Sequence, residues 1–561
     1  MSALPGWPSM DADVVATPLA PPGLPRSLDY PDVPIGAILL GAARRWPDRV
    51  GWIDPTAPEG SQELTFAAAA ARASQFAHAL RARGVGPGDV VAVHAPNCID
   101  YPVVYYGILL AGATFSPTNP LLPPDDLAFQ LTDCGARVVV TWGIAAPAIA
   151  AVRDRIPAEL VVGITTDAAG TSDSVDVDLE AFLSGQPTEP PTVDIDVRND
   201  LAHLAYTGGT TGRSKGVALP YRNVIVNSLQ YACWGTGSLP KVDDDGGLVL
   251  DQVGSEDEWP ARVGTGVAIN LTPWFHAMGT IGGLNIAVLT GSTLVLHLRF
   301  DPGRYLEDAE RYRITSMGGA PPIYVALLQH PDIDKRDLSS VLGISSGAAP
   351  LPVEILEEMK VRFPQAKIGE GYGLTEVTMG ATSNPSWRSG TRKVGSVGVP
   401  VFDTEIKLVD GEVCIRGPQV MRGYHNQPEA TADVLEDGWL RTGDIGVIDE
   451  DGYLTIVDRK KDMLIYKGYN VYPRELEELL FQHPAIANAA VVGKYDVAVG
   501  DLPVAFVVLS EPDADAEDVM AWVNERVTPY KKIRAIHVVD QIPVSAAGKV
   551  LRRELRDQLK T

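Results

Sequence analysis

Residues 206–216 read Tyr-Thr-Gly-Gly-Thr-Thr-Gly-Arg-Ser-Lys-Gly and combine four glycines, three threonines and one lysine. Glycines let backbone N–H groups approach an anion, threonine hydroxyls donate to phosphate oxygens, and a lysine adds a point charge. The segment is not a Walker A loop, because Lys215 lies between Ser214 and Gly216 and not between a glycine and a hydroxyl residue. The composition predicts a phosphate-binding loop, with a flexible glycine turn as the alternative.

Residues 370–376, Glu-Gly-Tyr-Gly-Leu-Thr-Glu, place an aromatic ring, a hydroxyl and a carboxylate within one short segment. A lone Gly-x-Gly is not the spaced dinucleotide-binding fingerprint. The ring of Tyr372 could stack on a nucleotide base, and Glu376 could hold Mg²⁺, which prefers carboxylate together with phosphate oxygens. A loop with an exposed glutamate is the alternative interpretation.

Two later segments contain charged residues. Their spacing alone does not show whether they bind a ligand or are solvated surface charges. Arg441-Thr-Gly-Asp444 offers a carboxylate that could accept hydrogen bonds from both hydroxyls of a ribose, and Arg459 could assist it from a facing lobe. Residues 543–549, Pro-Val-Ser-Ala-Ala-Gly-Lys, place Lys549 on a glycine turn ahead of a basic helix. Each segment by itself is more simply explained as surface charge.

The order of the motifs along the chain indicates a family. They are TGGTTGRSKG (207–216), PWFHAMG (273–279), SGAAPLP (346–352), GYGLTE (371–376), RTGD (441–444), DRKKDMLIYKGYNVYP (458–473) and PVSAAGK (543–549). This set resembles the adenylate-forming superfamily, which comprises acyl-CoA synthetases, 4-coumarate–CoA ligases, luciferases and peptide-synthetase adenylation domains. The resemblance covers roughly residues 35–556, and the acyl-CoA branch is the most similar.

The resemblance implies a role for individual residues. The loop that grips pyrophosphate would consist of Thr207, Gly208, Gly209, Thr210, Thr211, Gly212 and Lys215. Adenine would lie between Gly371, Tyr372 and Gly373 on one side and Gly347, Ala348 and Ala349 on the other. The remaining implied roles are α-phosphate contact for Thr375, Mg²⁺ binding for Glu376 with Thr207, ribose binding for Asp444 and Arg459, acyl-carboxylate contact for His276, and catalysis for Lys549.

The implied reaction has two steps. A carboxylate attacks the α-phosphorus of ATP, and Lys549 offsets the charge that builds on the phosphoryl oxygens. A small domain then rotates about a hinge at residues 458–462, with Lys461 as pivot, and presents the loop that contains Lys467 and Gly468 to the thioester step. The implied cofactors are ATP, Mg²⁺ and coenzyme A. Candidates to meet the phosphates of CoA are Lys460, Lys531, Lys532, Arg534 and Arg552.

The motifs define the acid substrate less closely than they define the nucleotide site. Residues 274–278 contain no carboxylate to pair with a buried ammonium, so amino acids are expected to be poor substrates. The residues expected to line the acyl pocket are small or apolar, namely Met278, Gly282, Gly283, Ala348, Gly371 and Gly373. Ile465 and Asn470 depart from the 4-coumarate ligase pattern, which favours medium- or long-chain fatty acids over aryl-propenoic acids.

Three other functions compete with the acyl-CoA ligase. An adenylating enzyme could pass its acyl group to a carrier protein or an amine, although the chain has no evident carrier domain. A nucleotide-binding protein without catalysis would be expected to have lost Lys215, Glu376, Asp444 or Lys549, yet all four are present. Luciferase-type oxygenation is the least favoured alternative.

Helical and strand patterns alternate along the chain. Residues 66–83 are predicted to be a helix that ends at Gly84, and residues 90–94 and 138–142 are predicted to be buried strands. The pattern predicts a mixed α/β fold: a large N-terminal domain with several sheets and a β-rich subdomain, residues 1–457, and a small mobile α+β C-terminal domain, residues 458–561. Residues 1–33 are interpreted as an extended arm, 166–200 as a surface connection, and the acidic segment 238–262 as a solvated loop.

Composition excludes several classes of protein. The net charge of −24 argues against nucleic acid as a partner, although residues 526–561 carry nine basic and three acidic side chains, as polyanionic ligands would require. The four cysteines lie far apart in sequence and lack metal-ligand spacing. The N-terminal residues do not form a signal peptide and no stretch has the length of a membrane span, so a cytoplasmic protein is expected. Peripheral contact with a membrane is compatible with the sequence. The oligomeric state could be a monomer or a homodimer.

Overall fold

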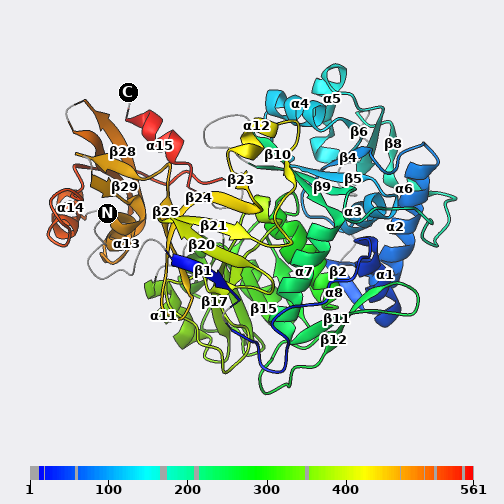
Figure 1. The fold of residues 1–561 in the computed structure, drawn as a ribbon, viewed down its shortest axis with the longest axis horizontal. Helices are drawn as coiled ribbons and strands as arrows, with labels where there is room; N and C mark the ends of the chain where they lie inside the picture. Colours follow the sequence, from blue (N-terminus) through cyan, green and yellow to red (C-terminus); the bar gives the residue numbers. More distant parts are fainter. Residues whose placement is uncertain are drawn as a thin grey trace.

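The structure is a computed structural model that describes residues 12–17, 19–56, 61–164, 174–207, 214–347, 351, 353–467, 469–497, 499–510, 514–545 and 550–559. In Figure 1 a large domain is followed by a smaller domain at one end, which contains the C-terminal residues. The mixed α/β fold with several sheets, predicted from the sequence, is confirmed. None of the helices in the described ranges combines the length and the apolar character needed to cross a membrane.

Two extensive mixed sheets form most of the large domain. The first has the strand order β22 (Gly423–Tyr424), β10 (Lys215–Pro220), β9 (Leu201–Thr207), β5 (Thr114–Thr118), β4 (Val90–His94), β6 (Ala136–Trp142), β7 (Leu160–Ile164) and β8 (Val177–Asp178). The second has the order β19 (Val399–Pro400), β18 (Thr382–Ser383), β17 (Lys367–Tyr372), β16 (Gly343–Ser346), β15 (Ser316–Gly319), β13 (Val267–Asn270), β14 (Thr293–Leu296), β2 (Val50–Asp54) and β3 (Gln62–Thr65).

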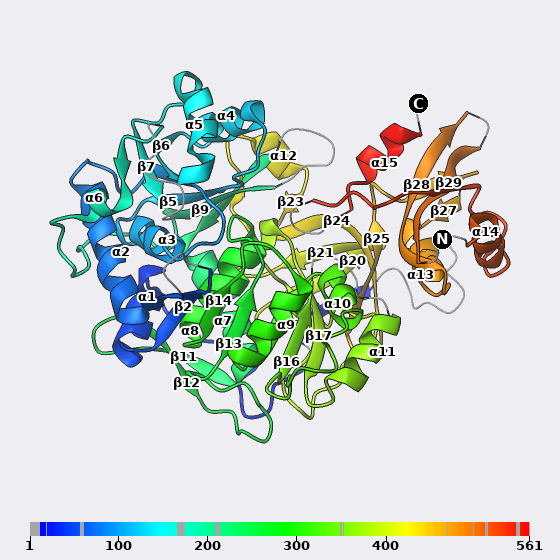
Figure 2. The same cartoon turned by 180° about the vertical axis from the view of Figure 1, so that it is seen from behind.

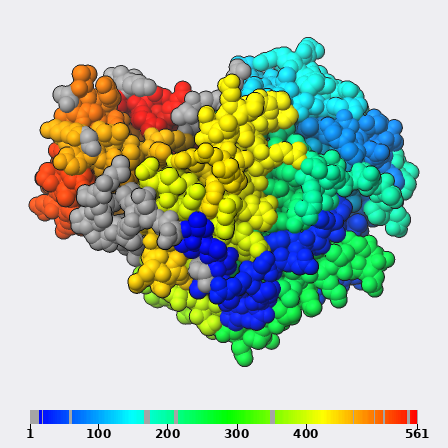
Figure 3. Space-filling view, viewed as in Figure 1, coloured from blue at the N-terminus to red at the C-terminus, as the bar shows by residue number. Residues whose placement is uncertain are grey.

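A third sheet is the β-rich part of the large domain. Its strands are β1 (Ala12–Ala16), β20 (Glu405–Val409), β21 (Glu412–Arg416), β24 (Trp439–Ile448) and β23 (Leu435–Glu436), and β25 (Leu454–Arg459) also pairs with β24. The N-terminal segment, blue in Figure 3, lies across the surface of this part of the molecule. It is therefore more than an extended arm, because β1 pairs with β20 and the hydroxyl of Tyr30 donates to Asp403 at 2.6 Å.

Helices cover and separate the sheets of the large domain, as the two views in Figures 1 and 2 show. They are α1 (Gly36–Arg45), α2 (Phe66–Arg81), α3 (Tyr101–Leu110), α4 (Pro124–Asp133), α5 (Ala146–Val152), α6 (Leu179–Leu183), α7 (Tyr221–Thr236), α8 (Ile286–Leu289), α9 (Pro302–Arg311), α10 (Pro321–Leu328), α11 (Val353–Arg362) and α12 (Pro428–Ala432). Short 3-10 helices are η1 (Gly143–Ala145), η2 (Arg153–Arg155) and η4 (Thr375–Val377), and η3 (Met278–Asn285) is a π-helix.

The local patterns that predicted these elements have clear physical causes. The side chain of Thr65 caps α2 by accepting from the backbone N–H of Ala68 at 3.2 Å, and Gly84 follows the helix with φ at +70°. Helix α3 is buried on every side, which suits its uniformly apolar sequence. The strand predicted at residues 90–94 is confirmed as β4.

The acidic segment 238–262 is not the solvated loop that its charge suggested. It contains an antiparallel hairpin of β11 (Ser238–Val242) and β12 (Leu248–Gln252), and Leu250 is completely buried. The hairpin packs on α1 so closely that a Cβ atom at Gly41 would lie 2.3 Å from the carbonyl oxygen of Leu248. Arg44 of α1 contacts Asp243 at 2.8 Å. Apolar side chains in the hairpin therefore anchor the acidic residues, which local charge alone did not reveal.

The surface connection expected at residues 166–200 is also partly wrong. Within its described part, β8 adds an edge strand to the first sheet and α6 packs on α2, with Leu179 and Phe182 only 1% exposed. Two or three apolar residues in an otherwise polar segment suffice to attach it to the core.

The small domain has its own sheet and core. The sheet has the order β27 (Tyr469–Val471), β26 (Leu464–Tyr466), β29 (Gly500–Leu509) and β28 (Ile486–Asp496), with β30 (Ala535–Val538) beside β29. Three helices accompany it: α13 (Pro473–Phe481), α14 (Ala516–Asn524) and α15 (Arg552–Gln558). Strand β25 still belongs to the large domain and ends at Arg459, so the expected hinge spans the end of β25 and the turn that follows.

Candidate active site

The ends of the predicted phosphate loop are held by two neighbouring strands. Thr207 ends β9, Lys215 begins β10, and the two residues are directly paired in the antiparallel register. The pairing brings the threonine hydroxyl and the lysine to the same place, although seven residues separate them in sequence. Gly208, Gly209, Thr210, Thr211 and Gly212 lie outside the described residues, so their phosphate contacts stay a prediction.

Tyr424 connects this loop to the Gly-Tyr-Gly-Leu-Thr-Glu motif. The Lys215 ammonium lies over the Tyr424 ring, 4.6 Å from its centroid, and the Tyr424 hydroxyl donates to Oε1 of Glu376 at 2.8 Å. Burial and the neighbouring Glu376 raise the pKa of Tyr424, so the phenol keeps its proton. The structure thus brings Lys215 and Glu376 to one cluster. Sequence reasoning missed Tyr424, and only the pairing of β22 with β10 locates it here.

The glycines around Tyr372 are required by close backbone contact. A Cβ atom at Gly373 would lie 1.9 Å from the carbonyl oxygen of Met379, and one at Gly371 would lie 2.9 Å from that of Thr382. These contacts fix the end of β17, after which Thr375 and Glu376 begin η4. The chain can fold back at this point only because glycine, which has no side chain, occupies both positions.

Tyr372 and Asp444 form a direct hydrogen bond. The Tyr372 hydroxyl donates to Oδ2 of Asp444 at 2.6 Å, and Nε of Arg459 lies 3.3 Å from the other carboxylate oxygen. Asp444 in β24 and Arg459 in β25 are paired in register, which explains why residues so distant in sequence meet. Asp444 is only 6% exposed, and burial raises the pKa of Tyr372. A carboxylate held in this way can accept hydrogen bonds from vicinal hydroxyls without rotating.

The Pro273–Gly279 segment is fixed to the first sheet. Asn97, which follows β4, accepts a hydrogen bond from the Trp274 N–H at 2.7 Å and donates to the carbonyl of Thr272 at 2.9 Å. These bonds position His276, which is partly buried, two residues before the π-helix η3 begins. π-Helices in proteins occur frequently at functional sites. Asn97 is a second residue that the motifs did not indicate.

Two methionines face glycines of the expected acyl pocket. A Cβ atom at Gly282 would lie 3.0 Å from the sulfur of Met379, and one at Gly347 would lie 3.4 Å from Cε of Met278. Gly347 follows Ser346, whose buried hydroxyl has no hydrogen-bond partner among the described residues. The position of Ala348 and Ala349, expected to cover adenine, lies outside the described residues.

A cavity of about 280 Å³ lies beside Glu376 and Tyr424. It is lined by Leu374, Glu376, Glu412, Tyr424, Asp433, Val434, Leu440, Arg441, Thr442, Gly443 and Lys460. Glu412 is buried and contacts Arg441 at 3.3 Å and Lys460 at 3.0 Å. The cavity therefore has both carboxylates and cations on its wall.

Comparisons with known proteins agree on one family. Residues 40–425 match the family described as AMP-binding enzyme, and residues 475–549 match the AMP-binding enzyme C-terminal domain. The chain belongs to the AMP-binding enzyme family. A long-chain-fatty-acid–CoA ligase of Bacillus subtilis is 34% identical over 96% of this chain and 97% of its own length. A 4-coumarate–CoA ligase of Oryza sativa is 35% identical over 88% of this chain and 87% of its own length.

Solved structures of similar proteins give the same result. An anthranilate–CoA ligase in complex with anthranoyl-AMP has a TM-score of 0.81 and 26% identity, and covers 95% of this chain and 98% of its own. MatB from Rhodopseudomonas palustris with bound ATP has a TM-score of 0.80 and 28% identity, and covers 94% of this chain and 99% of its own. As an AMP-binding enzyme, the chain is thus similar to its relatives over both domains.

In this AMP-binding enzyme the small domain carries the other expected residues. Lys467 is exposed, has a φ of +49° and donates its backbone N–H to Val499 at 2.7 Å. Gly468 and Lys549 lie outside the described residues. Among the expected CoA-phosphate ligands, Lys531 is buried and pairs with Glu475 at 2.6 Å, and Arg552 pairs with Glu477 at 2.7 Å. Arg534 is exposed and lies 5.0 Å from the centroid of the Tyr466 ring.

Glu376 has the chemistry of a magnesium ligand in this enzyme. Its carboxylate lies on the cavity wall, and the described residues contain no group of three or more His, Cys, Asp or Glu side chains that could enclose a metal. Mg²⁺ keeps several waters and binds through one or two carboxylates together with phosphates of the substrate. One carboxylate on the wall of an open cavity fits that preference.

Proposed function

We propose that the chain is an AMP-forming acyl-CoA ligase, which joins a carboxylic acid to coenzyme A at the expense of ATP through an acyl-adenylate. The observation that carries the proposal is the Tyr372–Asp444–Arg459 contact in a chain whose residues 40–425 and 475–549 match the two domains of AMP-binding enzymes. Relatives named for CoA ligation of fatty and of aryl acids support the same activity.

Each of the expected site residues would have its own role in forming the acyl-adenylate. Asp444 and Arg459 hold the ribose, Tyr372 orients Asp444 through its hydroxyl, and Thr207 with Lys215 holds the pyrophosphate end. Glu376 with Thr207 binds Mg²⁺, which neutralises charge on the phosphates when it is bound. His276 lies beside the acid, and Lys549 stabilises the charge that develops at the α-phosphate.

The acid is proposed to be a medium- or long-chain fatty acid, with an aryl-propenoic acid as the second candidate. Gly282 and Gly347 leave space that is bounded by the flexible side chains of Met379 and Met278, and methionine adapts to irregular apolar ligands. CoA phosphates are proposed to meet Arg534 and Lys532, because Lys531 and Arg552 already have carboxylate partners within the small domain.

The test is a panel of acids assayed for pyrophosphate release, with and without CoA and with and without Mg²⁺. Acyl-CoA and AMP should form in equal amounts with at least one fatty acid and only in the presence of Mg²⁺. Pyrophosphate release that never leads to acyl-CoA would support the second candidate, an adenylating enzyme that passes its acyl group to a carrier protein or an amine. The similarity of the fold to an amide bond synthetase makes this the relevant alternative.

A further inference from the structure

Arg474 lies where the small domain meets the last strand of the large domain. Its backbone N–H is at the start of α13 and donates to Oδ2 of Asp458 at 3.1 Å. No side chain caps α13 from its own N-cap residue, so Asp458 supplies the missing acceptor from β25. The Arg474 guanidinium also donates to the carbonyl of Ile456. Ile456 and Asp458 are two residues apart in β25 and present the same face to α13.

These contacts cross the expected hinge. Ile456 and Asp458 belong to β25, which pairs with β24 of the large domain, whereas α13 packs on β28 of the small domain. Asp458 is 6% exposed, and the Arg474 side chain is 13% exposed. A rotation about Lys461 must therefore separate a buried carboxylate and a carbonyl from their donors. Contacts of this kind are costly to break without replacement.

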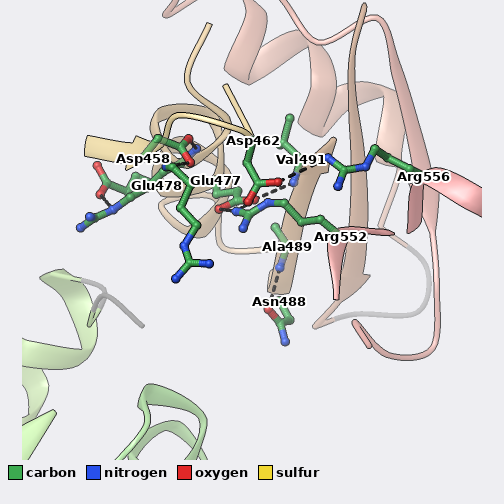
Figure 4. A network of polar contacts seen from close by, with 11 residues as sticks. Asp458, Asp462, Glu477, Glu478, Asn488, Ala489, Val491, Arg552 and Arg556 are labelled. Carbon is green, nitrogen blue, oxygen red and sulfur yellow. Dashed lines mark hydrogen bonds and ion pairs between the residues drawn. The ribbon is translucent and has the colours of Figure 1, made fainter. Parts of the chain in front are cut away.

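Side-chain contacts connect α13 to α15. Glu477 of α13 pairs with Arg552 of α15 through two hydrogen bonds of 2.7 and 2.8 Å, and it also accepts from the N–H of Val491. Arg556 of α15 lies 3.4 Å from Asp462 in the hinge. Figure 4 shows Arg552 and Arg556 reaching these carboxylates from α15. Helix α15 begins three residues after Lys549 in the sequence, so the contacts that hold α13 also hold the helix that follows Lys549.

We infer that Arg474 is a positioning residue that latches the small domain in the arrangement seen here, in which α13 and α15 are held beside the hinge. This inference rests on the proposed function, in which adenylation needs Lys549 and thioester formation needs the small domain to rotate. Loss of the latch lowers the population of this arrangement, so it changes the rate of adenylation relative to that of thioester formation.

The experiment compares Arg474→Ala and Arg474→Lys with Arg526→Ala. The Arg526 guanidinium contacts Trp522 and Glu525, both within the small domain, so Arg526→Ala controls for loss of a cation. Single-turnover rates are measured for adenylation from acid and ATP, and for thioester formation from a supplied acyl-adenylate. For Arg474→Ala the ratio of the two rates should change about tenfold, which corresponds to about 1.4 kcal/mol. Arg474→Lys should shift it in the same direction by less, and Arg526→Ala should leave it unchanged.

A second readout does not require activity. The four native cysteines are buried, so dyes can be attached selectively to cysteines introduced at the exposed positions Val361 of α11 and Val497 of the small domain. Energy transfer between them should change in Arg474→Ala and stay as in the parent in Arg526→Ala. If Arg474→Ala does not fold, Asp458→Ala, which removes the acceptor of the Arg474 N–H, serves as the second variant. An unchanged rate ratio together with unchanged energy transfer would overturn the latch. An enzyme that is inactive on every acid but shows altered energy transfer would instead refute the proposed function and keep the latch.

Discussion

The hydroxyl of Tyr372 gives a sharp test of the proposed ribose site. Tyr372→Phe removes one oxygen atom and leaves the ring, so stacking on a base would be preserved. The lost donor lies 2.6 Å from a carboxylate of Asp444, which is 6% exposed and retains Arg459 at 3.3 Å. A hydrogen bond to a charged group contributes about 1.5–3 kcal/mol. If Asp444 holds the ribose only when oriented by this bond, kcat/KM for ATP should fall about ten- to hundredfold, since each 1.4 kcal/mol corresponds to a factor of ten.

The assay is ATP–pyrophosphate exchange at saturating acid, with ATP varied. Tyr453→Phe is the matched control, because its hydroxyl donates to the carbonyl of Thr391 at 2.7 Å in a buried position away from the nucleotide site. That variant should have the parental kcat/KM for ATP. Equal kcat/KM values for Tyr372→Phe and the parent would show that Asp444 needs no orientation by Tyr372, or that it does not bind the ribose.

Three other predictions concern stability, pH and the acid. Leu250→Ala should lower the free energy of unfolding by about 2–5 kcal/mol, because it leaves a cavity under the hairpin, whereas the exposed Val253→Ala should have little effect in the same denaturant titration. Burial raises the pKa of Glu370 to about 7, so its contribution to stability is greatest below its unfolded value of 4.5 and is lost as the pH rises through 7. Glu370→Gln should therefore unfold at a higher denaturant concentration than the parent at pH 8 and about equally at pH 4.5; parallel pH profiles would contradict this explanation. Gly282→Leu should displace Met379 and lower kcat/KM more for long acids than for short ones, and an equal loss for both would remove Gly282 from the acyl pocket.

Much of the fold was predictable because local sequence and burial agree. The apolar run at β4 and the helix that ends before Gly84 need no distant information. The hairpin at residues 238–252 was misinterpreted because its acidic residues dominate the local composition, while Leu248 and Leu250 contribute only when α1 is present to cover them. Packing of this kind is a property of the tertiary structure and is not visible in a short window of sequence.

The site was predictable to the extent that its residues belong to ordered motifs. Tyr372, Asp444, Arg459, Lys215 and Glu376 were all expected, and the structure brings them into two adjoining clusters. Tyr424 and Asn97 were missed because each enters the site through strand pairing or a loop after a strand, with no motif of its own. Likewise, the sequence indicated the ring of Tyr372 for stacking but gave no sign that its hydroxyl would bond Asp444.

The central claim is that a carboxylate oxygen attacks the α-phosphorus of ATP. The most direct measurement uses a fatty acid labelled with ¹⁸O in both carboxyl oxygens, ATP, Mg²⁺ and CoA, followed by mass spectrometry of the nucleotide product. The account predicts AMP that carries one ¹⁸O atom for each acyl-CoA formed, with no label in pyrophosphate. Unlabelled AMP, or label in inorganic phosphate accompanied by ADP, would contradict an acyl-adenylate and with it the proposed function.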